Sequence, residues 1–402
     1  GSLQALLANV TSDPASVAAA EAAEAAGNQG QTATLTTAQD LFNGGSGEDV
    51  IRGVAGVQVG GQDQTTLNSS DVLDGGAGTD KLVINMTGPA YVGGATIKNI
   101  ETLQIGTDIA AAAFDYNVNA GAYEVTGTNT VIWDQINNGE ALAVNNITPS
   151  SSASKAPAFS WENEAGSRAG VMTANYRVAA VSGTADNQDV QLKNINAMNA
   201  GDGMMNIGGG VETITITSAG AVANNTLNNS ANADTGNNAV AADVISAGTL
   251  TKVVLKGDVA IGKAAGVVSA AVAQGLTDRA VGNDMGLTPD ATTNPTESNL
   301  LSVGARVTEV DATGMNASAN VRFVAKNDGS ATNVTFKGGK AADYAEFELG
   351  NINATGGDGD DTFGFINALA NSTFGEGDSI EGGAGKDTIQ IGVNGNAQRY
   401  DI

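Results

Sequence analysis

One six-residue pattern, Gly-Gly-x-Gly-x-Asp, occurs four times in this chain of 402 residues. An apolar residue follows each copy two positions later: Ile51, Leu82, Phe363 and Ile389. Glycine is common, at 54 residues, yet a chain of this composition would contain only roughly 0.07 such matches by chance. The four copies are therefore a feature of the fold and not a result of the amino-acid composition. The copies are Gly44-Gly45-Ser46-Gly47-Glu48-Asp49, Gly75-Gly76-Ala77-Gly78-Thr79-Asp80, Gly356-Gly357-Asp358-Gly359-Asp360-Asp361 and Gly382-Gly383-Ala384-Gly385-Lys386-Asp387.

Glycine-aspartate repeats of this type form the calcium-binding turns of parallel β-rolls. Calcium is a hard cation that takes oxygen ligands, including backbone carbonyls. Glycines allow a turn to adopt positive φ and to direct successive carbonyls inward, and the aspartate adds a charged oxygen. The apolar residue after each copy starts a short strand that faces the core. The alternative is a set of ordinary Gly/Asp turns without metal.

The four copies form two pairs, and both pairs share an acidic lead-in to their second member. The lead-ins are Asp71-Val72-Leu73-Asp74 and Asp378-Ser379-Ile380-Glu381. A degenerate copy, Gly338-Gly339-Lys340-Ala341-Ala342-Asp343, lacks the third glycine, and we interpret it as a structural turn. The predicted Ca²⁺ ligands are Gly44, Gly45, Gly47, Asp49, Asp71, Asp74, Gly75, Gly76, Gly78, Asp80, Gly356, Gly357, Asp358, Gly359, Asp361, Asp378, Glu381, Gly382, Gly383, Gly385 and Asp387.

The charge balance excludes several classes of protein. There are 43 acidic and 18 basic residues, a net charge of -25, and neither His nor Cys. So acidic a compact state repels itself, and divalent cations relieve that repulsion. No basic stripe is present to bind nucleic acid. Disulfides, thiolate chemistry and the usual zinc ligands are absent. No apolar stretch is long enough for a membrane-spanning helix.

We expect a short N-terminal region followed by one long β domain. Residues 1–31 hold a helix, capped at Ser12-Asp13-Pro14 and ending at Gly27, with a linker. The initial Gly1-Ser2 suggests a piece of a longer protein with an upstream domain. Residues 32–402 are predicted to be the calcium-binding solenoid, built from short strands between Gly/Asn/Asp turns. Insertions are expected near 148–170 (an exposed loop), 219–242 and 262–280.

In these motifs, the chain resembles a known family, the repeat-in-toxin-type calcium-binding region of bacterial surface-layer proteins exported by type I secretion. The resemblance rests on the two paired units and on the strand phrases Ile100-Glu101-Thr102-Leu103 and Val211-Glu212-Thr213-Ile214. It implies an all-β, right-handed parallel β-solenoid that folds with calcium outside the cell and assembles into a lattice. It also implies that Asp49, Asp80, Asp361 and Asp387 ligate calcium, with glycine carbonyls beside them.

The favoured prediction is a secreted, non-enzymatic structural component at the bacterial cell surface, whose folding and self-assembly calcium drives. The alternative is a calcium-dependent adhesin that binds a cell-surface polysaccharide, with Trp133, Trp161 and Tyr176 stacking on sugars. The least favoured is a β-helix polysaccharide lyase or epimerase, or a glycosidase using Glu162 and Glu164. The lack of His excludes a serine triad and a zincin site.

Overall fold

For the residues that it describes, the computed structural model confirms an all-β fold with one short helix. It describes residues 10–27, 29–56, 58–59, 62–116, 125, 127–148, 156–165, 167, 169–177, 181, 183, 185–195, 204–207, 210–221, 224–225, 250–261, 301–303, 307–317, 319, 321–325, 333–347, 351–367, 374–393 and 398–402. Two compact units are present, the first made of Gly1–Ile132 with Thr148–Pro157 and the second of Trp133–Ile147 with Ala158–Ile402.

The predicted N-terminal helix is α2 (Pro14–Gly27). Asp13 caps it, because its Oδ1 accepts a hydrogen bond of 2.9 Å from the Ala15 N–H. Proline at the first helical position costs nothing, since that position needs no N–H donor. The helix therefore begins and ends where the sequence indicates. Within the described part of the chain, no helix is long and apolar enough to cross a membrane.

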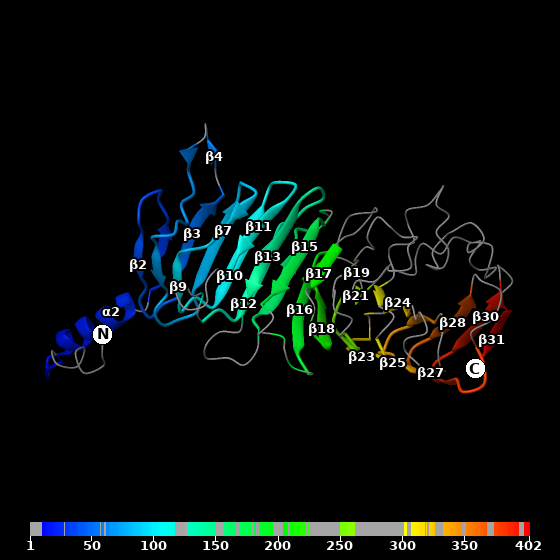
Figure 1. Cartoon of the computed structure of the whole chain (residues 1–402). Coiled ribbons are helices and arrows are strands. Elements are labelled where there is room, and N and C mark those ends of the chain that lie inside the picture. Colours follow the sequence, from blue (N-terminus) through cyan, green and yellow to red (C-terminus); the bar gives the residue numbers. More distant parts are fainter. Residues whose placement is uncertain are drawn as a thin grey trace. The chain divides into compact units, whose positions relative to one another are not determined.

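The first unit stacks parallel strands in short coils, with β3, β7 and β10 side by side in blue to cyan (Figure 1). Its main sheet has the order β1-β3-β7-β10-β12, and a smaller sheet has the order β2-β6-β9. The strands are β1 (Thr32–Thr34), β2 (Leu41–Asn43), β3 (Val50–Ala55), β4 (Gln58–Val59), β5 (Gln62–Asp63), β6 (Val72–Asp74), β7 (Lys81–Met86), β8 (Ala90–Tyr91), β9 (Thr96–Lys98), β10 (Thr102–Thr107), β11 (Ala112–Asp115) and β12 (Thr130–Asp134), which runs on into the second unit.

The second unit repeats this construction. One sheet has the order β14-β16-β18-β20-β23-β25-β27-β29, and another has the order β22-β24-β26-β28-β30-β31. Figure 1 shows β28, β30 and β31 together in red. In the described part of this unit, the strands pair in parallel, except that β31 runs antiparallel to β30.

The strands of the second unit have the following bounds. They are β13 (Ala141–Ile147), β14 (Ala158–Glu162), β15 (Val171–Tyr176), β16 (Asn187–Lys193), β17 (Met204–Ile207), β18 (Thr213–Ala219), β19 (Asn224–Asn225), β20 (Lys252–Gly257), β21 (Ala260–Ile261), β22 (Leu301–Val303), β23 (Glu309–Met315), β24 (Arg322–Ala325), β25 (Asn333–Lys337), β26 (Tyr344–Phe347), β27 (Asn351–Asp358), β28 (Thr362–Asn367), β29 (Ser379–Ala384), β30 (Thr388–Val393) and β31 (Gln398–Asp401).

In-register stacking explains how narrow coils build a core. Ile51 of β3 pairs with Leu82 of β7, which pairs with Leu103 of β10. All three side chains point inward and are at most 1% exposed. Because side chains alternate along a strand, one apolar face per strand suffices when every coil places it on the same side. The chain therefore forms parallel β-solenoid units, as predicted.

The prediction of an exposed loop at 148–170 is wrong for the centre of that segment. Residues Ala158–Glu162 form β14, and the Trp161 side chain is 0% exposed. The ring of Trp133 packs edge-on against Phe159 at 5.1 Å between centroids. Large aromatic side chains thus fill this part of the interior. The Ser-rich run before β14 misled the prediction, because burial of two Trp residues outweighs local turn preference.

Two other predicted insertions fall largely or wholly outside the described residues. The segment at 262–280 lies entirely outside them. Of the segment at 219–242, only residues 219–221 and 224–225 are described, and β19 occupies the second pair.

Candidate metal-binding turns

The glycine turns of the first unit stack directly on one another. The turn 44–49 joins β2 to β3, and the turn 75–80 joins β6 to β7. Because β2 pairs with β6 and β3 with β7, the two turns lie on adjacent coils. The Ala77 N–H donates to the Gly45 carbonyl at 2.9 Å. The stacking brings the two predicted motifs of this unit together.

Close approach explains the first glycine of the motif. A Cβ on Gly44 would meet the carbonyl oxygen of Gly75 and the Oδ2 of Asp49. A Cβ on Gly356 would likewise meet the Gly382 carbonyl and the Asp361 Oδ2. The missing side chain thus lets a backbone carbonyl and a carboxylate oxygen pack directly against the glycine Cα. Carboxylate and carbonyl oxygens are both ligand types that Ca²⁺ accepts, although a complete shell takes roughly six to eight of them.

A column of three acids runs beside the turns of the first unit. Asp49 N–H donates to Asp80 Oδ1 at 2.7 Å, and Asp80 N–H donates to Glu101 Oε2 at 2.7 Å. Asp49 itself accepts from Gln31 N–H at 2.5 Å and from Gly45 N–H at 3.0 Å. Asp49 and Asp80 are each 1% exposed. We call Asp49, Asp80 and Glu101 the N-terminal acid column.

The second unit contains an equivalent arrangement. Asp343 N–H donates to Asp361 Oδ1 at 2.7 Å, and Asp361 N–H donates to Asp387 Oδ1 at 3.0 Å. Asp343 accepts from Val321 N–H and Gly339 N–H, each at 2.7 Å. We call Asp343, Asp361 and Asp387 the C-terminal acid column. All three are at most 3% exposed.

The hydrogen bonds of the two columns show which acids correspond, and this correspondence differs from the pairing of motifs expected from the sequence. Asp49 corresponds to Asp343, because both use their two oxygens to accept a neighbouring-coil N–H and a glycine N–H. Asp80 then corresponds to Asp361. The sequence instead pairs the motif around Asp80 with the motif around Asp387, which lies on the coil next to that of Asp361. The degenerate turn ending at Asp343 is a full member of the stack.

Sequence reasoning missed two members of the columns as site residues. Asp343 had a signal, since the outline of the repeat surrounds it. Glu101 lies in no glycine motif, and only its place in the phrase Ile100-Glu101-Thr102-Leu103 set it apart. That phrase was read as a strand, and β10 does begin directly after Glu101.

The middle acid of each column has an unsatisfied oxygen. Asp80 Oδ2 and Asp361 Oδ2 are buried and have no hydrogen-bond partner. Burial raises the pKa of Asp80, and repulsion by the Asp49 and Glu101 carboxylates adds to the effect. Burial likewise raises the pKa of Asp361 to about 7, with contributions from Asp343 and Asp387. A buried carboxylate in this state needs either a proton or a cation.

These residues fit a hard cation only together with the backbone. Among the described residues, no group of three or more acidic side chains is placed to hold a metal ion by itself. The free oxygen of Asp361 and the carbonyl of Gly382, however, lie over the same glycine. In the first unit, the Asp80 Oδ2 and the Asn99 carbonyl face the Cα of Gly75 in the same way. The donor chemistry is therefore that of Ca²⁺, with carboxylate and carbonyl oxygens.

Asp71 and Asp378 lie away from the glycine turns, at another corner of their coils. Strand β6 separates Asp71 from Gly75, and Asp71 accepts from Asp40 N–H and Asn68 N–H, both at 2.8 Å. Asp378 accepts from Ile352 N–H and Gly375 N–H, both at 2.8 Å. Each acid uses both oxygens to cap backbone amides at a different corner of its coil.

The other predicted acids lie at the surface of the turns. Asp74 Oδ1 accepts from Gly76 N–H at 3.1 Å and from Asn99 Nδ2 at 2.8 Å, which ties two coils together. Asp358 and Glu381 are exposed. The remaining predicted glycines all lie in the stacked turns 44–49, 75–80, 356–361 and 382–387.

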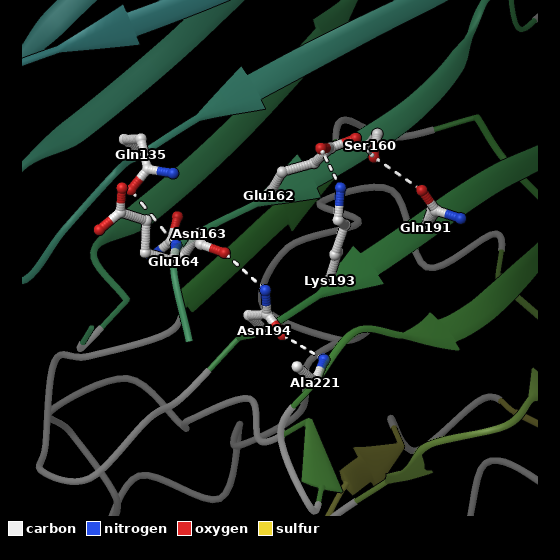
Figure 2. A network of polar contacts seen from close by, with 9 residues as sticks. All are labelled: Gln135, Ser160, Glu162, Asn163, Glu164, Gln191, Lys193, Asn194 and Ala221. Atoms are coloured by element: carbon white, nitrogen blue, oxygen red, sulfur yellow. Dashed lines mark hydrogen bonds and ion pairs between the residues drawn. The ribbon is translucent and has the colours of Figure 1, made fainter. Parts of the chain in front are cut away.

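The acid pair considered for glycoside hydrolysis has structural partners. Glu162 Oε2 pairs with Lys193 Nζ at 2.9 Å, and Ser160 Oγ donates to Glu162 Oε1 at 2.8 Å (Figure 2). Glu164 is exposed, and its backbone N–H donates to Gln135 Oε1. An acid neutralised by a lysine on the next strand is an ion pair of the sheet surface.

Figure 2 also shows a ladder of amides between successive coils of the second unit. Asn163 Nδ2 donates to the Ile136 carbonyl at 3.0 Å, and Asn194 Nδ2 donates to the Asn163 carbonyl at 2.9 Å. The Ala221 N–H then donates to Asn194 Oδ1 at 2.7 Å. These bonds satisfy backbone groups at the corner where the strands end.

Of the aromatic residues considered for sugar stacking, the two Trp are buried and Tyr176 is partly buried. Trp133 and Trp161 are both 0% exposed. Tyr176 stacks on Phe159, with 5.9 Å between ring centroids, and its hydroxyl hydrogen-bonds Gln188 Oε1 at 2.5 Å. All three rings therefore pack against neighbours in the second unit, and full burial removes Trp133 and Trp161 as sugar contacts.

Comparison with models of protein families, with characterised proteins and with solved structures finds no match to this chain. The resemblance to calcium-binding surface-layer proteins therefore stays a prediction that rests on the turn motifs.

The raised acid pKa values predict how the metal-free protein responds to pH. The folded state holds protons on Asp361 (pKa about 7) and Asp343 (about 6) more tightly than the unfolded chain, in which the pKa is near 3.8. Their contribution to stability is thus fully present below pH 3.8 and is lost as the pH rises through about 6 to 7. We expect the thermal midpoint in metal-free buffer to increase as the pH falls from 8 to 5.

General relief of the acidic charge acts in the same direction, so a variant has to separate the two effects. Asp361→Asn removes the titrating group and retains an oxygen acceptor for the Asp343 N–H. Its midpoint should depend less on pH than that of the wild type over the same range. Parallel curves for the two proteins would show that Asp361 does not titrate as described.

Proposed function

We propose that this protein is a structural surface-layer component whose folding and assembly outside the cell are driven by calcium. The observation that carries the proposal is the unpartnered, buried carboxylate oxygen of Asp80 and of Asp361 within stacked glycine turns. A fold with buried acids in mutual repulsion is poorly stable until a counter-charge is supplied. Calcium supplies that charge and accepts carbonyl as well as carboxylate oxygens.

The proposed mechanism uses this chain's own residues as follows. Without calcium, each acid column places three carboxylates on adjacent coils, which opposes closure of the stack. The glycines let the turn carbonyls approach the middle carboxylate. A ligand that binds only the folded form stabilises it by about 2.7 kcal/mol at a hundredfold excess over its dissociation constant. The chain would thus stay unfolded where calcium is scarce and would fold after secretion.

Calcium is also proposed to promote assembly of copies of the chain. A net charge of -25 keeps copies of the chain apart. Bound divalent cations lower that charge, and open strand edges then offer backbone groups to a neighbouring copy. We therefore propose the protein itself as its main partner, in a lattice or fibre at the bacterial cell surface. A structural role requires no catalytic residues.

The adhesin alternative has lost its clearest support, because both Trp side chains are buried. A polysaccharide would have to bind the polar outer faces of the sheets instead. The glycosidase alternative is likewise weakened, because Glu162, one of its two acids, forms an ion pair with Lys193.

Circular dichroism and electron microscopy test the proposal together. We expect the chain to be largely unfolded in EGTA at neutral pH, to gain β structure when millimolar calcium is added, and then to form ordered assemblies. Magnesium at the same concentration serves as the control for non-specific charge screening. An equally folded protein in EGTA and in calcium would contradict calcium-driven folding. Folding without assembly, together with binding on a glycan array, would favour the adhesin.

A further inference from the structure

The first coil of the first unit leaves one sheet edge open. Strand β1 is the terminal strand of its sheet, and among the described residues it pairs with β3 alone. Thr32 and Thr34 are exposed, and Ala33 between them is half-buried. An edge strand presents unpaired backbone N–H and C=O groups to any chain that can pair with it.

Two hydrogen bonds show which backbone groups of β1 point to the open edge. The Val50 N–H donates to the Gln31 carbonyl at 2.8 Å, and the Leu35 N–H donates to the Arg52 carbonyl at 2.8 Å. Residues 31 and 35 therefore face β3. Successive residues of a strand direct their N–H and C=O groups to opposite sides, so those of the two threonines of β1 face away from β3.

The sequence around this edge lacks the usual protection against pairing. Charged side chains and Pro keep natural edge strands from pairing with other chains. Neither occurs from residue 25 through residue 39, although the whole chain has a net charge of -25. The terminal strand β29 of the second unit, in contrast, contains Glu381 and begins directly after Asp378. Strand β1 thus adds no charge of its own where two equally acidic copies meet.

The interior is also incompletely covered at the first coil. Phe42 of β2 pairs with Leu73 of β6. Leu73 is 0% exposed, because β6 lies between β2 and β9. Phe42 is only half-buried, on the terminal strand of the same sheet. The end of a solenoid generally needs a cover over its apolar interior. A coil laid on this end would cover Phe42 and pair with β1 at the same time.

We infer that a second copy of this chain covers this end, in a two-fold dimer whose β1 strands pair antiparallel about Ala33. The pairing is self-complementary, because Thr-Ala-Thr reads the same in both directions and sets Thr32 of each copy opposite Thr34 of the other. Their outward N–H and C=O groups then form hydrogen-bonded pairs, and Thr–Thr pairs across strands are favourable. The inference rests on the proposed self-assembly and adds to it the surface that two copies share. Because a two-fold contact closes on itself, the dimer is the building block of an assembly and not its lattice contact.

Sedimentation equilibrium of the full chain in millimolar CaCl₂ measures this dimer. Thr34→Pro removes the outward N–H and leaves the hydrogen bonds between β1 and β3 in place, since an edge strand tolerates Pro where its N–H faces solvent. Each copy loses one donor, so the dissociation constant of the dimer should rise by about tenfold or more. Thr34→Ala is the matched control. It keeps the N–H and should change the dissociation constant clearly less.

Disulfide formation gives a second measurement that does not depend on proline. The chain contains no Cys, so a single introduced Cys can pair only with its own copy. Opposite residues of a non-hydrogen-bonded antiparallel pair have Cα atoms about 4.5 Å apart, which lies within the range that a disulfide bridges. Ala33→Cys should therefore form a covalent dimer on mild oxidation. Val92→Cys is the control at a side chain that is 66% exposed, and it should form far less dimer.

The outcomes separate this inference from the proposed function. A wild-type chain that stays monomeric at every concentration, or a Thr34→Pro dimer as stable as that of the wild type, would overturn the inference. Ala33→Cys that crosslinks no faster than Val92→Cys would overturn it as well. Calcium-induced folding and ordered assembly together with an undiminished Thr34→Pro dimer would retain the proposed function and reject this inference alone. A wild-type dimer that Thr34→Pro weakens, without calcium-induced folding or ordered assemblies, would support the inference and reject the proposed function.

Discussion

Replacing Gly356 with Ala is expected to destabilise the second unit by about 3 kcal/mol or more, at the upper end of the cost of overpacking. The new Cβ would meet the Gly382 carbonyl and the Asp361 carboxylate, and neither is the free end of a flexible side chain. The backbone has little room to move, because the Gly338 N–H donates to the Thr355 carbonyl at 2.8 Å on the adjacent coil.

Gly375→Ala is the matched control for this substitution. A Cβ at Gly375 would have nothing within 4 Å, so its effect should lie within about 0.5 kcal/mol of zero. Urea unfolding followed by far-ultraviolet circular dichroism, with and without calcium, measures both variants. Equal midpoints for the two variants would show that the glycine turns are not tightly stacked. A calcium-dependent gain in stability should also shrink in Gly356→Ala alone.

Trp161→Ala is expected to cost about 3–5 kcal/mol, the usual range for removing a large aromatic side chain from a core. Trp161 is fully buried on β14, and β14 pairs with β16, with Trp161 opposite Leu192. The indole Nε1 has no hydrogen-bond partner, and this offsets part of the gain from burial. Trp161→Phe should therefore cost clearly less than Trp161→Ala, because it keeps most of the ring and removes the unpaired donor.

An exposed apolar residue provides the control for the Trp161 variants. Leu41 is 73% exposed on β2, so Leu41→Ala should change the unfolding midpoint very little. The same urea titration applies to all three variants. A Trp161→Ala chain as stable as Leu41→Ala would favour the exposed loop that the Ser-rich sequence suggests.

Much of the fold could be predicted because it depends on local patterns. The strand phrases Ile100-Glu101-Thr102-Leu103 and Val211-Glu212-Thr213-Ile214 run into β10 and β18. The helix after Asp13 followed from its cap and its proline. The prediction for 148–170 failed because polar flanking residues hid a buried strand, and only packing around Trp133 and Phe159 decides its place.

The candidate site was predicted in part. The motif aspartates Asp49, Asp80, Asp361 and Asp387 are all buried beside glycine turns, as their sequence pattern indicates. The acidic lead-ins suggested additional ligands, yet Asp71 and Asp378 cap amides at another corner. A sequence shows that an acid precedes a strand, but it does not show whether both carboxylate oxygens will find N–H donors.

The amino-acid sequence by itself determined that glycine-aspartate corners and short apolar strands would stack in parallel coils. That follows from local chemistry, since glycine permits the turns and alternation orients the side chains. Only the tertiary structure decided which acids share a column. Their separations along the chain are 31 and 21 residues in one column and 18 and 26 in the other. The number of residues between two strands does not fix how they pair. The register of the strands therefore places Glu101 next to Asp80.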